Sequence, residues 1–378
     1  DEGMVKSDQL NDFSTNIVNN SIQFRTNLNI DLKAGLKLQI NSVSTLDKYN
    51  GPLAEQTTAY YYAFNASPVD FAPTYPADLS HNWPHILFGN ALTDKINPYA
   101  LIQMGYKKRT RFNTQNRAEL QHNLSAWIKG LEYRLSVSYV QTGYYTNAFT
   151  TVPSIYALTD YDFETGEHTL LALNPTKARR TLEPYTAGNT STTDTRVTYT
   201  GTLLHTAAWG DNQTSLTGVA QMQERTFTPT TSVLDGQPQR NLTFSGRASY
   251  GYKNRYFAET SFGYNGSERF DEHNRFGFFP AVGGAWVATS EPWMKKTQSW
   301  LDYLKFRLSY GKVGNDGVIS TPRFVFLPTL DVVGVGLDVE PYSSTTFDRD
   351  RVVSYANNNI QWEVAEQSNL GIEAKLFK

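Results

Sequence analysis

The amino-acid sequence predicts an all-β protein whose antiparallel strands run up and down in chain order. Apolar and polar residues alternate with a period of two in most extended segments. In residues 256–264, for example, Tyr256, Phe262 and Tyr264 share one side, and Glu259 and Ser261 lie on the other. No long segment has the period of a helix, and only residues 290–302 are expected to hold a helical turn. We expect about eleven strands.

The connections between the predicted strands alternate between short and long. Tight turns are expected at 33–35, 126–130, 209–213 and 251–254, and long connections at 45–108, 146–194 and 312–358. This alternation places the long connections together at one end of the sheet. Transmembrane β-barrels have this pattern, with tight periplasmic turns and long extracellular loops. A soluble sandwich with Greek-key links has no reason to keep it.

The composition excludes several classes of function without deciding between a soluble and a membrane protein. The 378 residues contain 34 Lys and Arg against 36 Asp and Glu, so no basic field indicates a nucleic-acid partner. The absence of Cys excludes disulfides, cysteine–zinc sites and thiol catalysis. The mean hydropathy of −0.47 fits a soluble protein. It also fits an outer-membrane barrel, because each barrel strand is only half apolar.

The spacing of tyrosines is a second indication of a membrane. Tyr133 and Tyr145 are roughly 30 Å apart along the membrane normal, at about 3.3 Å per residue and a tilt of about 40°. The same arithmetic separates Tyr256 and Tyr264 by roughly 20 Å. The apolar band of a barrel is about 25 Å tall, with aromatic girdles at both rims. Tyrosine also favours strands in general. The spacing therefore supports a membrane location mainly because it agrees with the connection lengths.

Four stretches resemble the barrel of the SusC/RagA-type TonB-dependent transporters. They are SFGYNGSERF (261–270), RFGFFPAVGGAW (275–286), LKFRLSYGKVGNDG (304–317) and IQWEVAEQSNLGIEAKLF (360–377). The resemblance implies a large barrel in a Gram-negative outer membrane that imports oligosaccharides or oligopeptides. It also implies a plug inside the barrel, a SusD-like surface lipoprotein as a lid, and energy supplied by the TonB–ExbB–ExbD complex through a TonB box.

The sequence departs from this family pattern in what it lacks. It shows no plug domain, no TonB box and no closing strand with a terminal aromatic residue. Eleven strands is also an odd number, whereas bacterial single-chain barrels have even numbers, and an open sheet would leave two edges in lipid. We therefore expect residues 1–378 to be the middle of a longer chain, forming part of one barrel domain in contact with outer-membrane lipid.

No catalytic or metal site is predicted, and we expect the protein not to be an enzyme. The sequence has no Ser-His-Asp order, no Gly-x-Ser-x-Gly and no phosphate-binding glycine loop. Asp160, Asp162, Glu164 and Glu167 have a spacing that resembles calcium ligands. They lack the twelve-residue calcium pattern and its central glycine. No cofactor is therefore expected, and calcium in this extracellular loop is an unsupported alternative.

Aromatic residues in the long connections are the candidate substrate contacts. An aromatic ring can stack on a sugar or hold an apolar side chain while its polar tip forms a hydrogen bond. The same rings could instead pack the loops against each other or against the lid. The candidates are Tyr60, Tyr61, Tyr75, Trp83, Tyr156, Tyr161 and Tyr342.

Three functions stay open on the sequence alone. The first is active import by a TonB-dependent transporter, with glycans slightly favoured over peptides because of the loop aromatics. The second is a passive, porin-like channel, which needs no plug. The third is a secreted β-sandwich that binds or processes carbohydrate, which predicts a soluble product.

Overall fold

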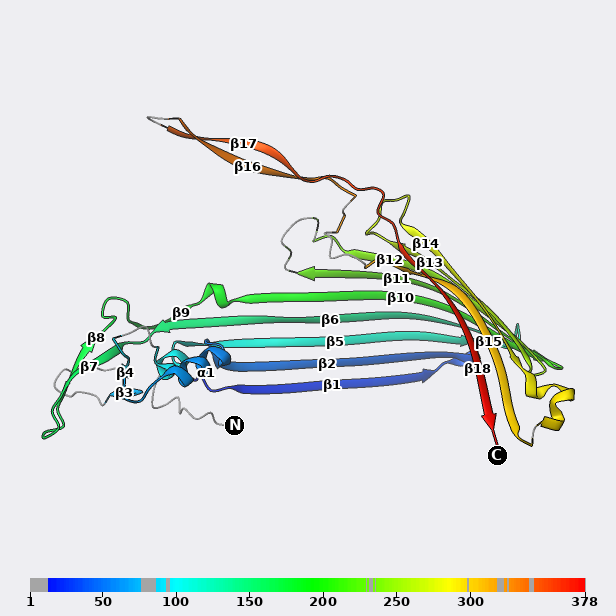
Figure 1. The fold of residues 1–378 in the computed structure, drawn as a ribbon, viewed down its shortest axis with the longest axis horizontal. Helices are drawn as coiled ribbons and strands as arrows, with labels where there is room; N and C mark the ends of the chain where they lie inside the picture. The colour runs from blue at the N-terminus through cyan, green and yellow to red at the C-terminus, as the bar shows by residue number, and fades with distance from the viewer. Residues whose placement is uncertain are drawn as a thin grey trace. The chain divides into compact units, whose positions relative to one another are not determined.

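The structure is a computed structural model, and almost all of its regular structure is β-strand (Figure 1). It describes residues 13–75, 86–92, 96–228, 230, 234, 236–297, 299–317, 323–324, 326–339 and 343–377. Among these residues, no helix has both the length and the apolar character needed to cross a membrane.

The main element is one large antiparallel sheet whose strands are hydrogen-bonded in chain order (Figure 1). The order is β1-β2-β5-β6-β10-β11-β12-β13-β14-β15-β18, and β9 pairs with β6 outside this path. These strands are β1 (Val18–Asp31), β2 (Leu36–Pro52), β5 (Gly105–Asn123), β6 (Leu131–Val152), β9 (Arg179–Pro184), β10 (Thr190–Trp209), β11 (Asn212–Thr228), β12 (Gln239–Tyr252), β13 (Tyr256–Ser267), β14 (Phe276–Val287), β15 (Leu301–Asn315) and β18 (Glu363–Leu376). The path confirms the predicted up-and-down fold of about eleven strands. It has no Greek-key crossover, so the sandwich alternative does not fit.

The chain divides into two compact units, and several long strands contribute residues to both. The first consists of the residues up to Arg25, Val43–Thr114 and Gln141–Thr193. Besides strand segments of the large sheet, it holds the helices α1 (Gln56–Asn65) and α2 (Pro98–Ile102). It also holds a small sheet of β3 (Thr74–Tyr75), β4 (Leu87–Gly89), β7 (Ile155–Tyr161) and β8 (His168–Ala172).

A compact core stabilises the long connections of the first unit. Its buried members are Phe71, Leu87, Phe88, Ala100, Tyr156 and Ala157. Asn97 is 1% exposed and caps α2, because its Oδ1 accepts from the backbone N–H of Tyr99 and Ala100 at 2.8 and 3.3 Å. Its Nδ2 donates to the carbonyls of Pro73 and Gly89 at 2.8 and 2.6 Å. One buried amide therefore joins α2 to β4 and to the segment before β3.

The expectation of a wholly irregular connection at 45–108 is wrong. β2 continues to Pro52, and α1 and α2 follow it. α1 has the sequence QTTAYYYAFN, in which the aromatic residues surround the helix and form no apolar stripe. α2 has only five residues, which is too short for a helical period to be visible.

The second unit consists of Thr26–Ser42, Gln115–Val140 and the residues from Asp194 onward. It holds the hairpins from β11 to β15, together with β18. A two-stranded hairpin, β16 (Thr329–Val339) and β17 (Ser343–Ser354), occupies the connection at 312–358, which was predicted as a polar segment without strands. The helical turn expected at 290–302 is confirmed as the 3-10 turns η4 (Ala288–Ser290) and η5 (Pro292–Thr297).

The strand registers give the sheet of the second unit one apolar and one polar face. Tyr250 pairs with Ala258, and Thr260 pairs with Val282, so these residues share a face. The large apolar residues of this face are exposed: Leu216, Met222, Phe244, Tyr250, Phe262, Phe278, Val282, Leu308, Leu370 and Ile372. Leu308 is 61% and Leu370 78% exposed. Such a large apolar surface marks an interaction with a membrane or a partner. The apolar side of the alternation therefore does not form a core.

Candidate functional site

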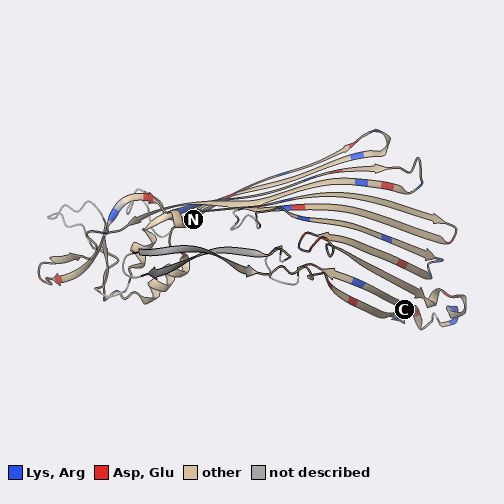
Figure 2. Ribbon diagram, turned by 90° about the horizontal axis from the view of Figure 1, so that it is seen from above, with Lys and Arg blue, Asp and Glu red and all other residues tan. Residues whose placement is uncertain are grey.

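The polar face of the second unit carries ion pairs between neighbouring strands, and Figure 2 shows charges of both signs on adjacent strands. Nη2 of Arg247 lies 2.6 Å from Oε2 of Glu259. Nε of Arg307 and Nζ of Lys305 lie 3.5 and 4.0 Å from the carboxylate of Glu373. These pairs keep charged groups on the face opposite to the apolar residues.

A groove of about 970 Å³ runs along this unit. Ser215, Glu259, Ser261, Arg307, Gln367 and Asn369 are among the residues that line it. Gly371 lies opposite Arg307, and a Cβ at Gly371 would lie 2.3 Å from the Arg307 side chain. The glycine therefore lets the guanidinium lie across β18. The groove offers hydroxyl, amide and guanidinium groups, which suit a polar solute.

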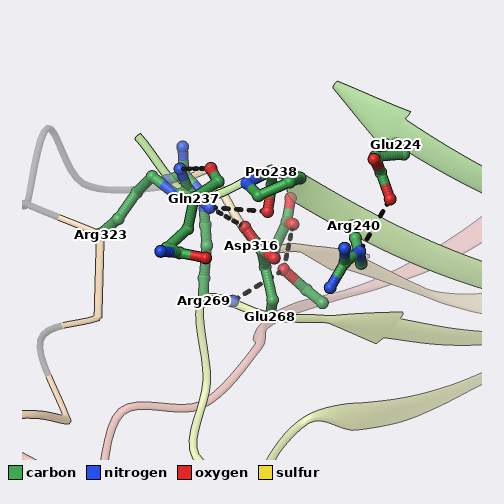
Figure 3. Close-up of polar contacts among 9 residues, drawn as sticks. Glu224, Gln237, Pro238, Arg240, Glu268, Arg269, Asp316 and Arg323 are labelled. Carbon is green, nitrogen blue, oxygen red and sulfur yellow. Dashed lines mark hydrogen bonds and ion pairs between the residues drawn. The ribbon is translucent and has the colours of Figure 1, made fainter. Parts of the chain in front are cut away.

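At the end of the sheet with the long loops, Arg323 joins three interstrand connections through hydrogen bonds and an ion pair (Figure 3). Its guanidinium donates to the carbonyls of Gln237 and Pro238 at 2.6 and 3.1 Å and forms an ion pair with Glu268. The side chain of Arg323 is 11% exposed and that of Glu268 20%. The connection after β15 is thereby tied to those between β11 and β12 and between β13 and β14.

A buried aromatic cluster supports the same group of loops. Phe270 and Phe279 each pack against Trp362, with ring centroids 5.3 Å apart, and both phenylalanines are buried. Nδ2 of Asn274 also donates to the carbonyls of Asn358 and Ile360 at 2.9 and 3.3 Å. The connection between β13 and β14 is therefore fixed to the segment that leads into β18.

Two of the predicted aromatic contacts lie on helix α1. Tyr60 and Tyr61 are 66% and 63% exposed, and Tyr61 packs edge-on against Tyr62 with ring centroids 5.3 Å apart. Both phenol rings are open to a ligand in the first unit. Substrate contact by these residues stays a prediction.

Three more of the predicted aromatic contacts come together in the small sheet of the first unit. Tyr75 stacks on His168 with ring centroids 6.2 Å apart, and Tyr161 packs edge-on against Phe163 at 5.0 Å. Tyr156 is buried, and this burial raises the pKa of its phenol. Tyr161 is 43% exposed. Substrate contact by these three residues stays a prediction. Trp83 and Tyr342 lie outside the described residues.

The acidic loop between β7 and β8 is organised by its own backbone. Oδ1 of Asp162 accepts from the backbone N–H of Glu164 and Thr165 at 2.7 and 3.2 Å. These hydrogen bonds hold the pKa of Asp162 below its ordinary value. Over the described ranges, no group of three or more His, Asp or Glu side chains converges as a metal site would require. Asp162 therefore stabilises the turn between β7 and β8.

The short-turn end of the second unit has its own polar centre at Glu291, which was not predicted. Its carboxylate accepts from the hydroxyl of Tyr256 and, at 3.2 Å, from Nε1 of Trp286. Nη1 of Arg255 lies 3.3 Å away. The Tyr256 and Trp286 hydrogen bonds and the Arg255 charge hold the pKa of Glu291 below its ordinary value. Only the closeness of Trp286 and Glu291 in sequence hinted at this arrangement.

Comparison with known proteins finds similar proteins among the TonB-dependent receptors. No known family profile matches the chain. TonB-dependent receptor SusC of Bacteroides thetaiotaomicron is 29% identical over 154 residues, covering 41% of this chain and 14% of that protein. TonB-dependent receptor P3 of Formosa agariphila is 29% identical over 132 residues, covering 35% of this chain and 12% of the relative. The chain is related to the SusC-like TonB-dependent receptors.

Solved structures place this SusC-like chain in the same fold. The RagAB peptide transporter matches with a TM-score of 0.59 at 16% identity, over 96% of this chain and 39% of that chain. The RagAB peptide importer in its open-open state matches with the same TM-score and identity, over 38% of its chain. At this identity the likeness shows the fold alone. The chain therefore spans well under half the length of the relatives and structures that it matches, and those named are receptors and transporters.

Proposed function

We propose that residues 1–378 form part of the wall of one TonB-dependent receptor barrel in a Gram-negative outer membrane. The complete protein imports oligosaccharides or oligopeptides actively and carries out no covalent chemistry. The observation that carries this proposal is the two-faced sheet of a SusC-like chain. Its apolar face is exposed over Phe262, Leu308 and Leu370, and its opposite face holds ion pairs such as Arg247–Glu259.

Lipid is the environment that suits such a sheet. A barrel turns its apolar residues toward the hydrocarbon and its polar residues toward the lumen. Open sheet edges are not tolerated in lipid. We therefore propose that β1 and β18, which end the hydrogen-bonded path of the large sheet, pair with further strands of the same barrel domain.

The proposed partners follow from the family. The named relatives are TonB-dependent, which supports energy coupling through the TonB–ExbB–ExbD complex. A SusD-like lipoprotein is the proposed lid. The loops joined by Arg323 and by the Phe270–Trp362–Phe279 cluster offer it a preorganised surface, because they do not have to be ordered on binding.

The substrate class is proposed as oligosaccharide or oligopeptide. The exposed rings of Tyr60 and Tyr61 support the first, since phenols stack well on sugar faces. The RagAB structures, described as those of a peptide transporter, support the second. The groove of the second unit, whose lining includes hydroxyl and amide groups, suits both.

Expression of the complete gene in a Gram-negative host tests this proposal. The membranes are separated on a density gradient, and the protein is examined on gels with and without heating. We then measure uptake of labelled oligosaccharides and oligopeptides in cells with and without TonB. The expected result is a heat-modifiable outer-membrane protein whose uptake of one substrate class is lost without TonB.

Each contrary outcome points to a different function. Recovery in the soluble fraction without a heat-modifiable band would exclude both membrane functions. Uptake that persists at the same rate without TonB would indicate the porin-like channel instead.

The proposed lid has its own test. Copurification of a lipoprotein with the barrel would support it.

A further inference from the structure

We propose that the short-turn end of the second unit is a binding surface for anionic phospholipid headgroups. This headgroup surface consists of Trp293, Lys295, Lys296 and Trp300 in the connection between β14 and β15, together with Trp127 and Lys129 in the turn between β5 and β6. The inference rests on the proposed membrane location, and it adds a specific lipid partner and the residues that recognise it.

Tryptophan is concentrated and exposed at this end. Trp127, Trp209, Trp293 and Trp300 each lie in or beside a connection that joins neighbouring strands at the short-turn end, and they are 82%, 54%, 63% and 50% exposed. Exposing four indole rings to water is unfavourable. Indole is favoured at the boundary between hydrocarbon and headgroups, where its ring is apolar and its N–H is solvated.

The 3-10 turns η4 and η5 hold their part of this surface in a fixed position. Glu291 binds Trp286, and the Trp286 ring lies 6.4 Å from Trp293 and 5.8 Å from Phe306, measured between centroids. Trp286 and Phe306 pair in register on the apolar face. On the other side, the backbone N–H of Phe377 donates to the carbonyl of Trp300 at 3.0 Å. The part of the headgroup surface between β14 and β15 is therefore continuous with the proposed lipid face.

The charges around these rings favour an anionic partner. Lys295 and Lys296 are exposed and have no ion pair with a carboxylate among the described residues. The nearest acidic groups in sequence are engaged, because Glu291 accepts three hydrogen bonds and Asp302 pairs with Lys375 at 2.7 Å. Lys129 is likewise exposed beside Trp127 and has no ion pair within the described ranges. Lysine next to a membrane surface attracts anionic lipid.

Fluorescence quenching of the complete protein in vesicles tests the inference. The protein is reconstituted in phosphatidylcholine that contains about 20 mol% of brominated lipid, either phosphatidylglycerol or phosphatidylcholine, and its tryptophan emission is measured. Bromine quenches nearby indole, so the ratio of the two quenching levels reports which headgroup is enriched at the protein. We expect a preference of about three- to fivefold for phosphatidylglycerol, reduced by salt because the attraction is electrostatic.

The test variant is Lys295→Gln/Lys296→Gln, which leaves every tryptophan and the Glu291 contacts in place. We expect the ratio of quenching by phosphatidylglycerol to quenching by phosphatidylcholine to fall toward about one in this variant. The matched control is Lys48→Gln/Lys177→Gln, which removes the same charge from exposed lysines of the other unit and should retain the wild-type preference.

The outcomes separate this inference from the proposed function. A heat-modifiable, reconstituted wild type without preference between the two lipids would overturn the headgroup surface and leave the barrel intact. An unchanged preference in the test variant, or an equal loss in the control, would also overturn it. Failure of the wild type to insert at all would instead contradict the proposed function.

Discussion

Arg247 and Glu259 form an ion pair across β12 and β13, with Nη2 and Oε2 2.6 Å apart, on the face opposite to Tyr250 and Phe262. The two residues are diagonal neighbours, since Arg247 pairs in register with Ser261 and Glu259 with Ser249. This diagonal lets a long guanidinium reach the carboxylate of the next strand. Because a charged pair is costly in hydrocarbon, the proposed barrel would turn the Arg247 face toward water and the Phe262 face toward lipid.

Leu135 tests this assignment on β6. Its side chain is 52% exposed and alternates with Ser136 along the strand. Leu135→Arg should reduce the free energy of unfolding by about 2–4 kcal/mol if the residue lies near the midplane of the bilayer. Ser136→Arg, which places the same charge on the opposite face, should have a much smaller effect. Denaturant titration of the folded barrel measures both, and equal losses would contradict the assignment.

Alanine substitutions at three glycines distinguish the cost of backbone strain from the cost of steric overlap. Gly130 has φ +80°, and a Cβ there would lie 1.8 Å from the Thr206 carbonyl oxygen. Gly210 has φ +53° with open space around it, and Gly218 has open space and no positive φ. An alanine at φ > 0 costs about 1–2 kcal/mol, and overpacking adds about 1–3 kcal/mol. In thermal unfolding, Gly130→Ala should lose most stability, Gly210→Ala less and Gly218→Ala least; a different order would contradict these surroundings of the three glycines.

Arg323 is predicted to control the opening of the loops it joins. Arg323→Ala removes hydrogen bonds to two carbonyls and the ion pair with Glu268. The local free energy of opening should fall by about 1–3 kcal/mol, so limited proteolysis in residues 228–239 and 267–276 should accelerate while heat modifiability persists. Arg240→Ala breaks only the exposed pair with Glu224 and serves as the control, for which little change is expected. Equal cleavage rates for the two variants would contradict the role of Arg323.

Glu291 predicts a specific loss of stability in acid. Its pKa is held below the ordinary value of 4.5 in the folded protein, first by the hydrogen bond from Tyr256. A carboxyl group with a lowered folded pKa contributes stability above its ordinary pKa, and that contribution is lost as the pH falls through the folded value. The midpoint temperature of thermal unfolding should therefore decrease as the pH is lowered below 4.5. In Glu291→Gln the midpoint should start lower and fall less; identical pH profiles would contradict the prediction.

The strands and their order were predictable because an apolar face and a polar face impose a simple period on each strand. Alternation across Phe262 and Ser261 needs no knowledge of the rest of the fold. The short and long connections then decide the topology, since consecutive strands of an up-and-down sheet are neighbours. Motif resemblance pointed to the TonB-dependent transporters, and the comparisons confirm that resemblance with relatives named TonB-dependent receptors.

The loop structure was not predictable, because it depends on contacts between residues that are far apart in the sequence. Arg323 and Glu268 are 55 residues apart, and nothing in either segment indicates the other. Tyr156 and Tyr161 have the same character in sequence, yet the first is buried and the second exposed. Both pair with β8, but only Tyr156 also pairs with β4. Side chains placed by long-range contacts leave no local period. The sequence therefore predicted individual loop aromatics as substrate contacts, but it could not separate the buried Tyr156 from the exposed Tyr161.

The most direct measurement of the central claim scans β13 with single cysteines. Residues 1–378 contain no cysteine. Once any cysteine elsewhere in the complete protein is replaced, one spin label can be attached in the reconstituted protein to each of Thr260→Cys, Ser261→Cys, Phe262→Cys, Gly263→Cys and Tyr264→Cys. Oxygen concentrates in hydrocarbon, whereas a soluble nickel complex reaches labels exposed to water. We predict that labels at 260, 262 and 264 respond to oxygen and those at 261 and 263 to nickel. Uniform accessibility along the strand, or the reverse alternation, would contradict a barrel wall with this face toward lipid.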